Sequence, residues 1–186
     1  MTEVERSPGR LIVITGAQAA GTTTVGYAVA ARLPRAVHVD GDAISAMVVS
    51  GGVPMTLPAP PAAVEQLFLR WLGAIAVAET YQQAGFDAVI TDNIFGEWLE
   101  DFLDFVSPAS VHLVMLNPSA EVLRERGAAR EKSGYDRDVT VEALFASVSE
   151  ETSRVGLWLD TSEQTVVETA NDILDRLGEA LLGADG

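Results

Sequence analysis

The chain contains no cysteine and almost no lysine. Without cysteine there are no disulfide bonds, no thiolate nucleophile and no thiolate-ligated metal. Lys132 is the one lysine, so arginines must supply nearly every other cationic side chain. Lysine and arginine together number 12 against 27 aspartates and glutamates, which gives a net charge of −15. Because this average field repels polyanions such as duplex DNA, we expect no nucleic-acid partner.

Long apolar runs are also missing from the sequence. We find no run that approaches the ~20 residues of a membrane span, and residues 1–10 lack the apolar core of a signal peptide. We therefore expect a cytoplasmic protein without a membrane partner. The 186 residues, of which 48% are hydrophobic, are enough for one domain with a sizeable core. The sequence predicts a single domain over 1–186 and leaves monomer and homodimer open.

The stretch from Leu11 to Thr24 organises the rest of the chain. Its first five residues read as a short buried strand, Gly16 breaks that pattern, and a helix follows Gly21. Strand, glycine loop and helix are the context of a phosphate-binding loop, in which backbone N–H groups and a helix N-terminus converge on the ligand. An ordinary tight turn is the alternative. The spacing Gly16-x4-Gly21 matches the pattern G-x4-G-K-[ST], which places the hydroxyl of Thr23 to hold Mg²⁺.

One position departs from this pattern. Thr22 stands where the pattern has a lysine that reaches the β- and γ-phosphates. Removing one such preorganised contact typically costs about 3–4 kcal/mol of transition-state stabilisation. The loop therefore indicates phosphate binding more firmly than it indicates fast phosphoryl transfer.

Carboxylates follow two of the predicted strands. Asp40 and Asp42 come after the strand at 36–39, and Asp92 ends the strand at 88–92. In open α/β sheets, functional groups gather at the carboxyl ends of the strands. Asp40 and Asp42 are therefore candidates for a general base or a metal contact, and Asp92 could accept a magnesium-bound water or contact the substrate. The alternative for each is turn chemistry, and Asp42 could instead cap a helix over 43–49.

A loop and a long helix come between those strands. Residues 51–61 are rich in glycine and proline, and we expect a loop there, over a substrate site. Apolar residues then recur at helical spacing from Val64 to about Ala84. Arg70 lies off that apolar stripe, where it is either solvated or faces the site.

Basic residues concentrate in one short segment of this acidic chain. Arg124, Arg126, Arg130 and Lys132 fall within nine residues. Arg126 and Arg130 are four residues apart and share one helix face, which suits binding of a triphosphate. A solvated helix with glutamate partners is the alternative. Lys132 or an arginine could also supply the charge that Thr22 lacks.

The alternation of elements predicts the fold class. Five strands separated by helices, the fourth at 111–116 and the fifth at 155–159, imply an α/β sandwich with a mostly parallel sheet and helices on both faces. After the fifth strand, Thr165 and Glu168 have the spacing of a capping box, and an apolar stripe predicts a last helix that extends to Leu181.

Taken together, these segments resemble a known family. It is similar to the P-loop small-molecule kinases, and within them to the chloramphenicol phosphotransferase-like group. The matching segments, in chain order, are GAQAAGTTT, VDGDAISAM, VITDNIFG, RERGAAREKSG and LWLDTS. They reach from the first strand to the fifth, and their order and spacing carry the resemblance.

The resemblance implies a P-loop NTPase-type fold with a five-stranded parallel sheet and a small lid at about 124–138. It also implies ATP as donor, Mg²⁺ as cofactor, and transfer of the γ-phosphoryl group to a hydroxyl of a small-molecule alcohol. An aspartate after the second strand would be the base: Asp40 or Asp42, with Asp42 slightly favoured. Metal contacts would come from Thr23 and Asp92. The residues expected to bind nucleotide are Gly16, Ala17, Gln18, Ala19, Ala20, Gly21, Thr22, Thr23, Thr24, Arg126 and Arg130.

Two hypotheses for function remain open at this stage. The carboxylates and arginines favour an active kinase, in which Arg130 is a catalytic residue together with Asp42 or Asp40 and clamps the phosphates as a lid arginine. Thr22 favours a nucleotide-binding or sensor protein of the same fold that has lost transfer chemistry.

Overall fold

The computed structural model describes residues 7–56, 58–128 and 140–183. A single sheet forms its centre, with the strand order β2-β3-β1-β4-β5 and all four of these pairings parallel. The strands are β1 (Leu11–Gly16), β2 (Ala36–Asp40), β3 (Asp87–Thr91), β4 (Val111–Leu116), β5 (Leu157–Leu159) and β6 (Leu181–Leu182). The predicted α/β fold with a parallel sheet is therefore confirmed.

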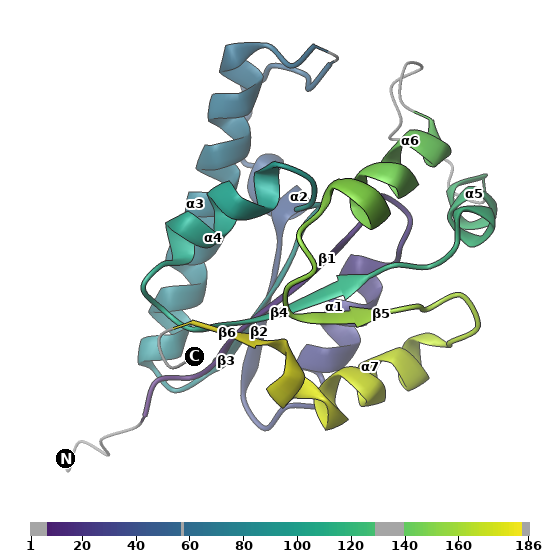
Figure 1. Ribbon diagram of the computed structural model, residues 1–186. Coiled ribbons are helices and arrows are strands. Elements are labelled where there is room, and N and C mark those ends of the chain that lie inside the picture. Colours follow the sequence, from purple (N-terminus) through teal and green to yellow (C-terminus); the bar gives the residue numbers. More distant parts are fainter. Residues whose placement is uncertain (1–6, 57, 129–139, 184–186) are drawn as a thin grey trace.

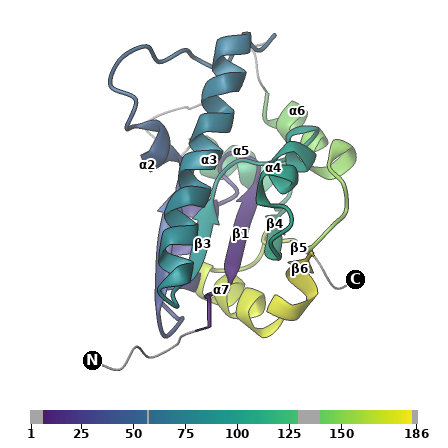
Figure 2. The same cartoon turned by 90° about the vertical axis from the view of Figure 1, so that its left-hand side faces the viewer.

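Helices cover both faces of this sheet (Figures 1 and 2). The α-helices are α1 (Thr22–Ala30), α2 (Gly41–Ser45), α3 (Pro61–Gln83), α4 (Trp98–Val106), α5 (Ala120–Ala128), α6 (Val141–Ala146) and α7 (Val166–Asp175). A π-helical turn (Ser147–Glu151) extends α6, and a 3₁₀ turn (Leu177–Ala180) follows α7. The last turns of α3 pack on the sheet, whereas its first turns project beyond the sheet together with the loop from α2 (Figure 2).

Alternate residues of the buried strands point to two separate cores. Ile12 and Ile14 of β1 face a cluster with α1 and α7, while Leu11 and Val13 face a cluster with α3 and α4. This alternation is what a strand with a period of two residues produces when both of its faces are covered. Trp71 of α3 and Phe102 of α4 are fully buried in the second core, where their rings meet edge to face.

The C-terminal region differs from its prediction. The capping box of Thr165 and Glu168 is present, but α7 ends at Asp175 instead of reaching Leu181. The chain then turns, and β6 pairs antiparallel with β4. The apolar periodicity continued past the helix because Leu177 and Ala180 are buried in the 3₁₀ turn that follows it.

Helix α3 bears on the expectation that the chain has no membrane-spanning run. It has 23 residues and, of the helices in the described part of the chain, is the one long and apolar enough to cross a membrane by length and composition. The sequence shows no apolar run of that length, because Glu65, Arg70 and Glu79 interrupt the apolar residues of the helix. Core helices pass the same test, and the inner side of α3 packs on the sheet through Trp71 and Ala78.

The strand order decides which segments meet at the functional edge. β1 is central, so the loop that follows it lies between the ends of β2 and β3 on one side and those of β4 and β5 on the other. In a parallel sheet all of these carboxyl ends lie at one edge. The side-chain hydroxyl of Thr15 links the end of β1 to the segment after β3. It accepts a hydrogen bond from the N–H of Ile94 at 2.7 Å and donates one to the carbonyl of Ile94 at 2.8 Å.

Candidate active site

The phosphate-binding loop predicted after β1 has the required backbone. Ala19 and Gly21 have positive φ of 71° and 97°, and the N–H of Ala20 donates to the carbonyl of Ala17 at 3.0 Å. The two glycines that flank the loop are required for different reasons. A Cβ at Gly16 would lie 2.5 Å from the carbonyl oxygen of Leu116, whereas Gly21 has open space but a left-handed conformation that L side chains rarely adopt.

The three threonines of the motif begin α1. Thr22 is half-buried, Thr23 and Thr24 are exposed, and Gly21 precedes them as a cap without a side-chain hydrogen bond. The first N–H groups of a helix have no partner within it and carry partial positive charge. This end of α1 is therefore suited to an anion such as a phosphate.

One cavity of about 340 Å³ opens beside this loop, on the side of β4 and β5. It is lined by Ala19, Ala20, Gly21, Thr24, Val25, Arg126, Thr161, Gln164, Thr165, Val166 and Thr169. Thr161, Gln164 and Thr165 come from the connection between β5 and α7, and Val166 and Thr169 from α7 itself. The buried hydroxyl of Thr161 has no hydrogen-bond partner among the described residues. We call this the donor-side cavity.

Arg126 joins the two walls of the donor-side cavity. Its Nη1 donates to the carbonyl of Ala20 at 3.2 Å, and its Nη2 donates to the carbonyl of Thr161 at 3.0 Å. Arg124, on the same helix, points away and pairs with Glu142 at 2.6 Å. The structure thus brings Arg126 to the loop and leaves Arg124 on the surface. Arg130, Lys132 and most of the expected lid lie outside the described residues.

The carboxylates after β2 have different environments. Asp40 caps α2, because its Oδ1 accepts from the N–H of Asp42 at 3.1 Å. This corrects the alternative in which Asp42 caps a helix over 43–49, since the helix begins at Gly41 and is shorter. The side chain of Asp42 is 85% exposed and lies 3.8 Å from Nη1 of Arg70.

Asp92, after β3, is buried and paired with Arg70. Its Oδ1 lies 2.7 Å from Nη2 of Arg70 and also accepts from the N–H of Asn93 at 2.7 Å. Its Oδ2 has no partner among the described residues and packs on Gly41, where a Cβ would lie only 2.2 Å away. Burial raises the pKa of Asp92 to about 6, although the positive charge of Arg70 opposes the shift.

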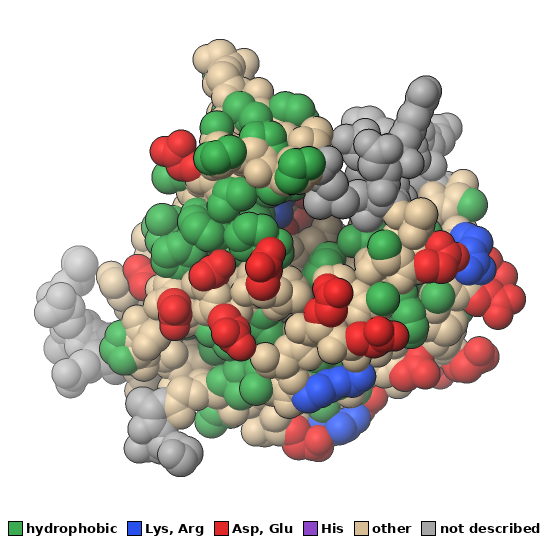
Figure 3. Space-filling model, turned by 45° about the horizontal axis from the view of Figure 1, so that its top comes forward, with side chains coloured by type: hydrophobic (Ala, Val, Ile, Leu, Met, Phe, Trp, Pro, Cys, Tyr) green, Lys and Arg blue, Asp and Glu red, His purple; other side chains and the backbone are tan. Residues whose placement is uncertain are grey.

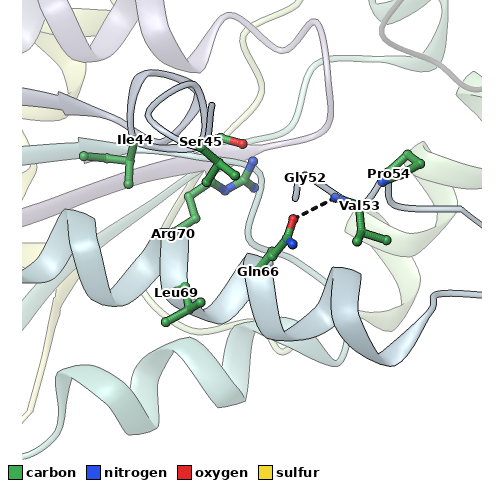
Figure 4. Close-up of a pocket in the computed structure, with 9 residues that line it drawn as sticks. Ile44, Ser45, Gly52, Val53, Pro54, Gln66, Leu69 and Arg70 are labelled. Atoms are coloured by element: carbon green, nitrogen blue, oxygen red, sulfur yellow. Dashed lines mark hydrogen bonds between the residues drawn. The ribbon is translucent and has the colours of Figure 1, made fainter. Parts of the chain in front are cut away.

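A second cavity, of about 320 Å³, lies between α2, the glycine- and proline-rich segment that follows it, and α3 (Figure 4). It is lined by Ile44, Ser45, Val48, Gly52, Val53, Pro54, Gln66, Leu69 and Arg70. Gln66 holds the wall in place, because its Oε1 accepts from Val53 N–H at 2.9 Å and its Nε2 donates to the carbonyl of Gly51 at 2.8 Å. The glycine- and proline-rich loop does border a cavity, which we call the acceptor-side cavity.

Sequence reasoning gave Arg70 no definite role and did not consider Gln66, Thr161 or Gln164. The position of Arg70 off the apolar stripe of its helix was the available signal. For Thr161 and Gln164, the segment after β5 was recognised, but its proximity to the phosphate-binding loop depends on the sheet order.

The donor atoms near the loop are oxygens. Among the described residues there is no group of three or more histidines, aspartates and glutamates that could hold a metal ion. The hydroxyl of Thr23 and the carboxylate of Asp92, whose Oδ2 has no partner, are ligands of the hard type that Mg²⁺ takes.

The parallel sheet and the glycine loop between β1 and α1 have the architecture of a P-loop α/β domain. Residues 11–153 match a family described as an AAA domain, AAA_33, and the chain belongs to this family. A search of curated proteins finds no match.

Several solved structures share the fold. A sugar kinase from Janibacter sp. HTCC2649 is 22% identical with a TM-score of 0.66, over 93% of this chain and 96% of that one. A gluconokinase from Sinorhizobium meliloti 1021 is 21% identical with a TM-score of 0.60, over 93% of each chain. The APS kinase CysC of Mycobacterium tuberculosis, in complex with AMPPNP and APS, is 17% identical with a TM-score of 0.66, over 92% of this chain and 98% of that one.

Proposed function

We propose that this protein is an ATP-dependent phosphotransferase of the chloramphenicol phosphotransferase-like type that phosphorylates a hydroxyl of a small molecule. The observation that carries the proposal is the phosphate-binding loop after the central strand, with one cavity lined by the loop itself and a second cavity lined by α2, the segment after it and α3, on the β2 side of the sheet where Asp40 and Asp42 lie. A phosphotransferase needs a donor site and an acceptor site that meet at the transferred group. The sugar kinase, the gluconokinase and the APS kinase that share the fold add support, because each is a kinase.

In this proposal the donor-side cavity holds the nucleotide. The loop from Gly16 to Thr24, with the N-terminus of α1, binds the phosphates, and Arg126 lies where it can contact the nucleotide. Arg130 is a further proposed phosphate ligand, and the segment 124–138 is the proposed lid. Thr23 and Asp92 are the residues that would hold Mg²⁺. When bound, that ion would neutralise charge on the transferred phosphoryl group.

The acceptor hydroxyl lies beside Asp42. Its oxygen forms a bond to the γ-phosphorus, the bond from the γ-phosphorus to the bridging oxygen of ADP breaks, and the hydroxyl proton passes to a carboxylate. Asp42 suits this task because it is exposed and near Arg70, whereas Asp40 is engaged as the cap of α2. Asp40 then positions the turn that presents Asp42.

Thr22 supports a second candidate function, a nucleotide-binding protein of the same fold with impaired transfer. Among the described residues, the cations nearest the site are engaged elsewhere: Arg126 on two backbone carbonyls and Arg70 on Asp92. Neither replaces the lysine in this arrangement.

Titration calorimetry with ATP and with a nonhydrolysable analogue, each with and without Mg²⁺, tests the proposal first. Magnesium-dependent binding in the micromolar range supports it, and ADP release that depends on an added alcohol then separates the kinase from the impaired protein. Thr23→Val should weaken the magnesium-dependent part of binding. Thr80→Val is the matched control, because the Thr80 hydroxyl bonds within α3 to the carbonyl of Ala76. Absence of binding up to millimolar nucleotide contradicts the proposal.

A further inference from the structure

We propose that the outer side of α3, together with the end of α4, forms a docking groove for an amphipathic, basic helix of a partner protein. We call this surface the α3–α4 groove. The proposal goes beyond the proposed function and does not rest on it, because none of its observations involves the phosphate-binding loop.

The α3–α4 groove is an open, apolar hollow of about 480 Å³. Its apolar lining comes from Pro61, Val64, Phe68, Leu69, Leu72 and Phe105. The side chains of Leu69 and Leu72 are 58% and 43% exposed, so this lining faces water in the isolated chain. Figure 3 shows hydrophobic side chains gathered over the projecting part of the molecule. A contiguous apolar surface of this kind marks an interaction site.

Aromatic packing fixes the floor of the groove. The ring of Phe68 meets the ring of Phe105 edge to face, with 5.3 Å between the ring centroids. Pro61, Val64, Phe68 and Leu72 follow one another at helical spacing along one side of α3. At 1.5 Å per residue this row is about 16 Å long, which is the length of about three turns of a second helix. The floor therefore suits a helix that lies along α3 with its apolar side inward.

The charges around the groove are negative. Glu65 lines it, and Glu79 lies further along the same side of α3. The acidic residues of α4 are Glu100, Asp101 and Asp104. Arg70 is the one cation within these two helices, and its Nη2 is paired with the buried Asp92 at 2.7 Å. The apolar floor thus has an acidic rim without free positive charge, which attracts lysine and arginine at the edges of a docked helix.

This charge pattern decides between the occupants that an apolar surface allows. A second copy docked about a two-fold axis would bring the acidic rim of one groove against that of the other, in a chain with a net charge of −15. An anionic lipid surface would likewise be repelled, because helices that lie in such a surface carry lysine and arginine on their polar face. A basic amphipathic helix matches both the floor and the rim.

Three labelled peptides test the proposal by fluorescence anisotropy with the full chain. The probe is a capped 15-residue peptide with leucine along one helical face and lysine along the other. A scrambled peptide has the same composition and charge but no apolar face, and a third peptide has glutamate in place of every lysine. We expect the probe to bind at least about tenfold more tightly than either. Equal binding of the scrambled peptide, or of the glutamate peptide, overturns the proposal.

Leu72→Ser tests the location of binding. Leu72 lines the α3–α4 groove alone, whereas Leu69 lines both this groove and the acceptor-side cavity. We expect the folded Leu72→Ser variant to bind the probe about tenfold more weakly. Val167→Ser is the matched control, because Val167 is a 54% exposed apolar residue on α7, which packs on the other face of the sheet. Unchanged affinity in Leu72→Ser, or an equal loss in the control, overturns the proposal.

Glu65→Lys tests the acidic rim. We expect this variant to weaken binding of the probe about tenfold. Glu163→Lys changes the net charge by the same amount at an exposed position after β5, at the opposite edge of the sheet, and should change the affinity much less. Equal effects of the two variants would mean that the overall charge alone attracts the probe, and they overturn the proposal.

Two further measurements examine the other occupants. Sedimentation of the wild type that shows a dimer, lost in Leu72→Ser, would assign the groove to a second copy. Binding to vesicles of phosphatidylcholine and phosphatidylglycerol, lost in the same variant, would assign it to lipid. Either result overturns the proposal, and we expect neither property to depend on Leu72. Because no measurement uses nucleotide, failure of the proposed function is seen separately.

Discussion

Arg70 and Asp92 form a buried ion pair, with 2.7 Å between Nη2 of Arg70 and Oδ1 of Asp92, and this pair joins α3 to the end of β3. It places a neutralised cation at the wall of the acceptor-side cavity and a buried carboxylate directly after β3, the strand that pairs with β1. Because Asp92 is 7% exposed, its ionisation is linked to the stability of the fold.

The stability contribution of Asp92 should decrease as the pH rises. Burial raises its pKa from the usual value of 3.8 to about 6, so the folded state binds the proton more tightly than the unfolded chain does. Its contribution to the free energy of unfolding then falls between these two pKa values and is constant above them. Urea denaturation measures the free energy of unfolding of the wild type and of Asp92→Asn. The value for the wild type minus that for the variant should fall by about 2 kcal/mol between about pH 4.5 and pH 7.5.

The contribution of Asp87 to the free energy of unfolding should depend on pH in the opposite direction. Although burial opposes its ionisation, hydrogen bonds from Arg10 lower the pKa of Asp87 below its usual value. The contribution of Asp87 is therefore lost as the pH falls, and the difference between the wild type and Asp87→Asn should rise with pH. If the difference in unfolding free energy between the wild type and Asp92→Asn also rises with pH, then the charge of Arg70 has a larger effect on the pKa of Asp92 than burial has.

Thr22→Lys should increase phosphoryl transfer. Since Arg70 and Arg126 are engaged with other groups, no described cation takes the place of the lysine, and restoring it supplies about 3–4 kcal/mol to the transition state. We expect kcat to rise by about a hundredfold or more, as measured by ADP release with a fixed acceptor. Thr24→Lys, two positions further along α1, is the control. If Thr22→Lys changes kcat little, another cation already acts there, and Arg130 and Lys132 are the residues to substitute next.

Arg126→Ala should weaken nucleotide binding. The guanidinium links the carbonyls of Ala20 and Thr161 across the donor-side cavity, so its removal loosens both walls and takes away a positive charge. We expect the Kd for Mg·ATP to rise by about tenfold or more, which corresponds to a charge-assisted contact of ~1.5–3 kcal/mol. Arg124→Ala removes an equal charge from the same helix at an exposed position and should leave the Kd unchanged. Equal effects of the two variants would point to long-range attraction instead of contact.

Gly41→Ala should destabilise the protein and disturb the acceptor side. The added Cβ would lie 2.2 Å from Oδ2 of Asp92, so either the carboxylate or the start of α2 must shift. We expect a loss of about 2 kcal/mol or more in unfolding free energy, in the range of overpacked buried sites. Gly178→Ala, where a Cβ would meet nothing within 4 Å, is the control. A fully stable Gly41→Ala variant would mean that Asp92 moves freely.

Local patterns were enough to predict much of this structure. The parallel sheet, the phosphate-binding loop and the capping box of α7 depend on neighbouring residues, and the structure has them near the predicted positions. β6 was missed because two residues pair with β4 only after the chain has turned back. Similarly, Arg70 could be placed off its apolar stripe, but its pairing with Asp92 depends on how α3 lies against the sheet.

The two cavities are built from the chain in different ways. The donor-side cavity draws on three separated segments, around residues 19–25, Arg126 and 161–169, which the whole sheet must bring together. Every lining residue of the acceptor-side cavity instead falls within residues 44–70. One contiguous stretch, exchanged as a cassette between relatives of this fold, could thus redirect acceptor choice while the nucleotide machinery stays intact, and such chimaeras are a practical route to new specificities.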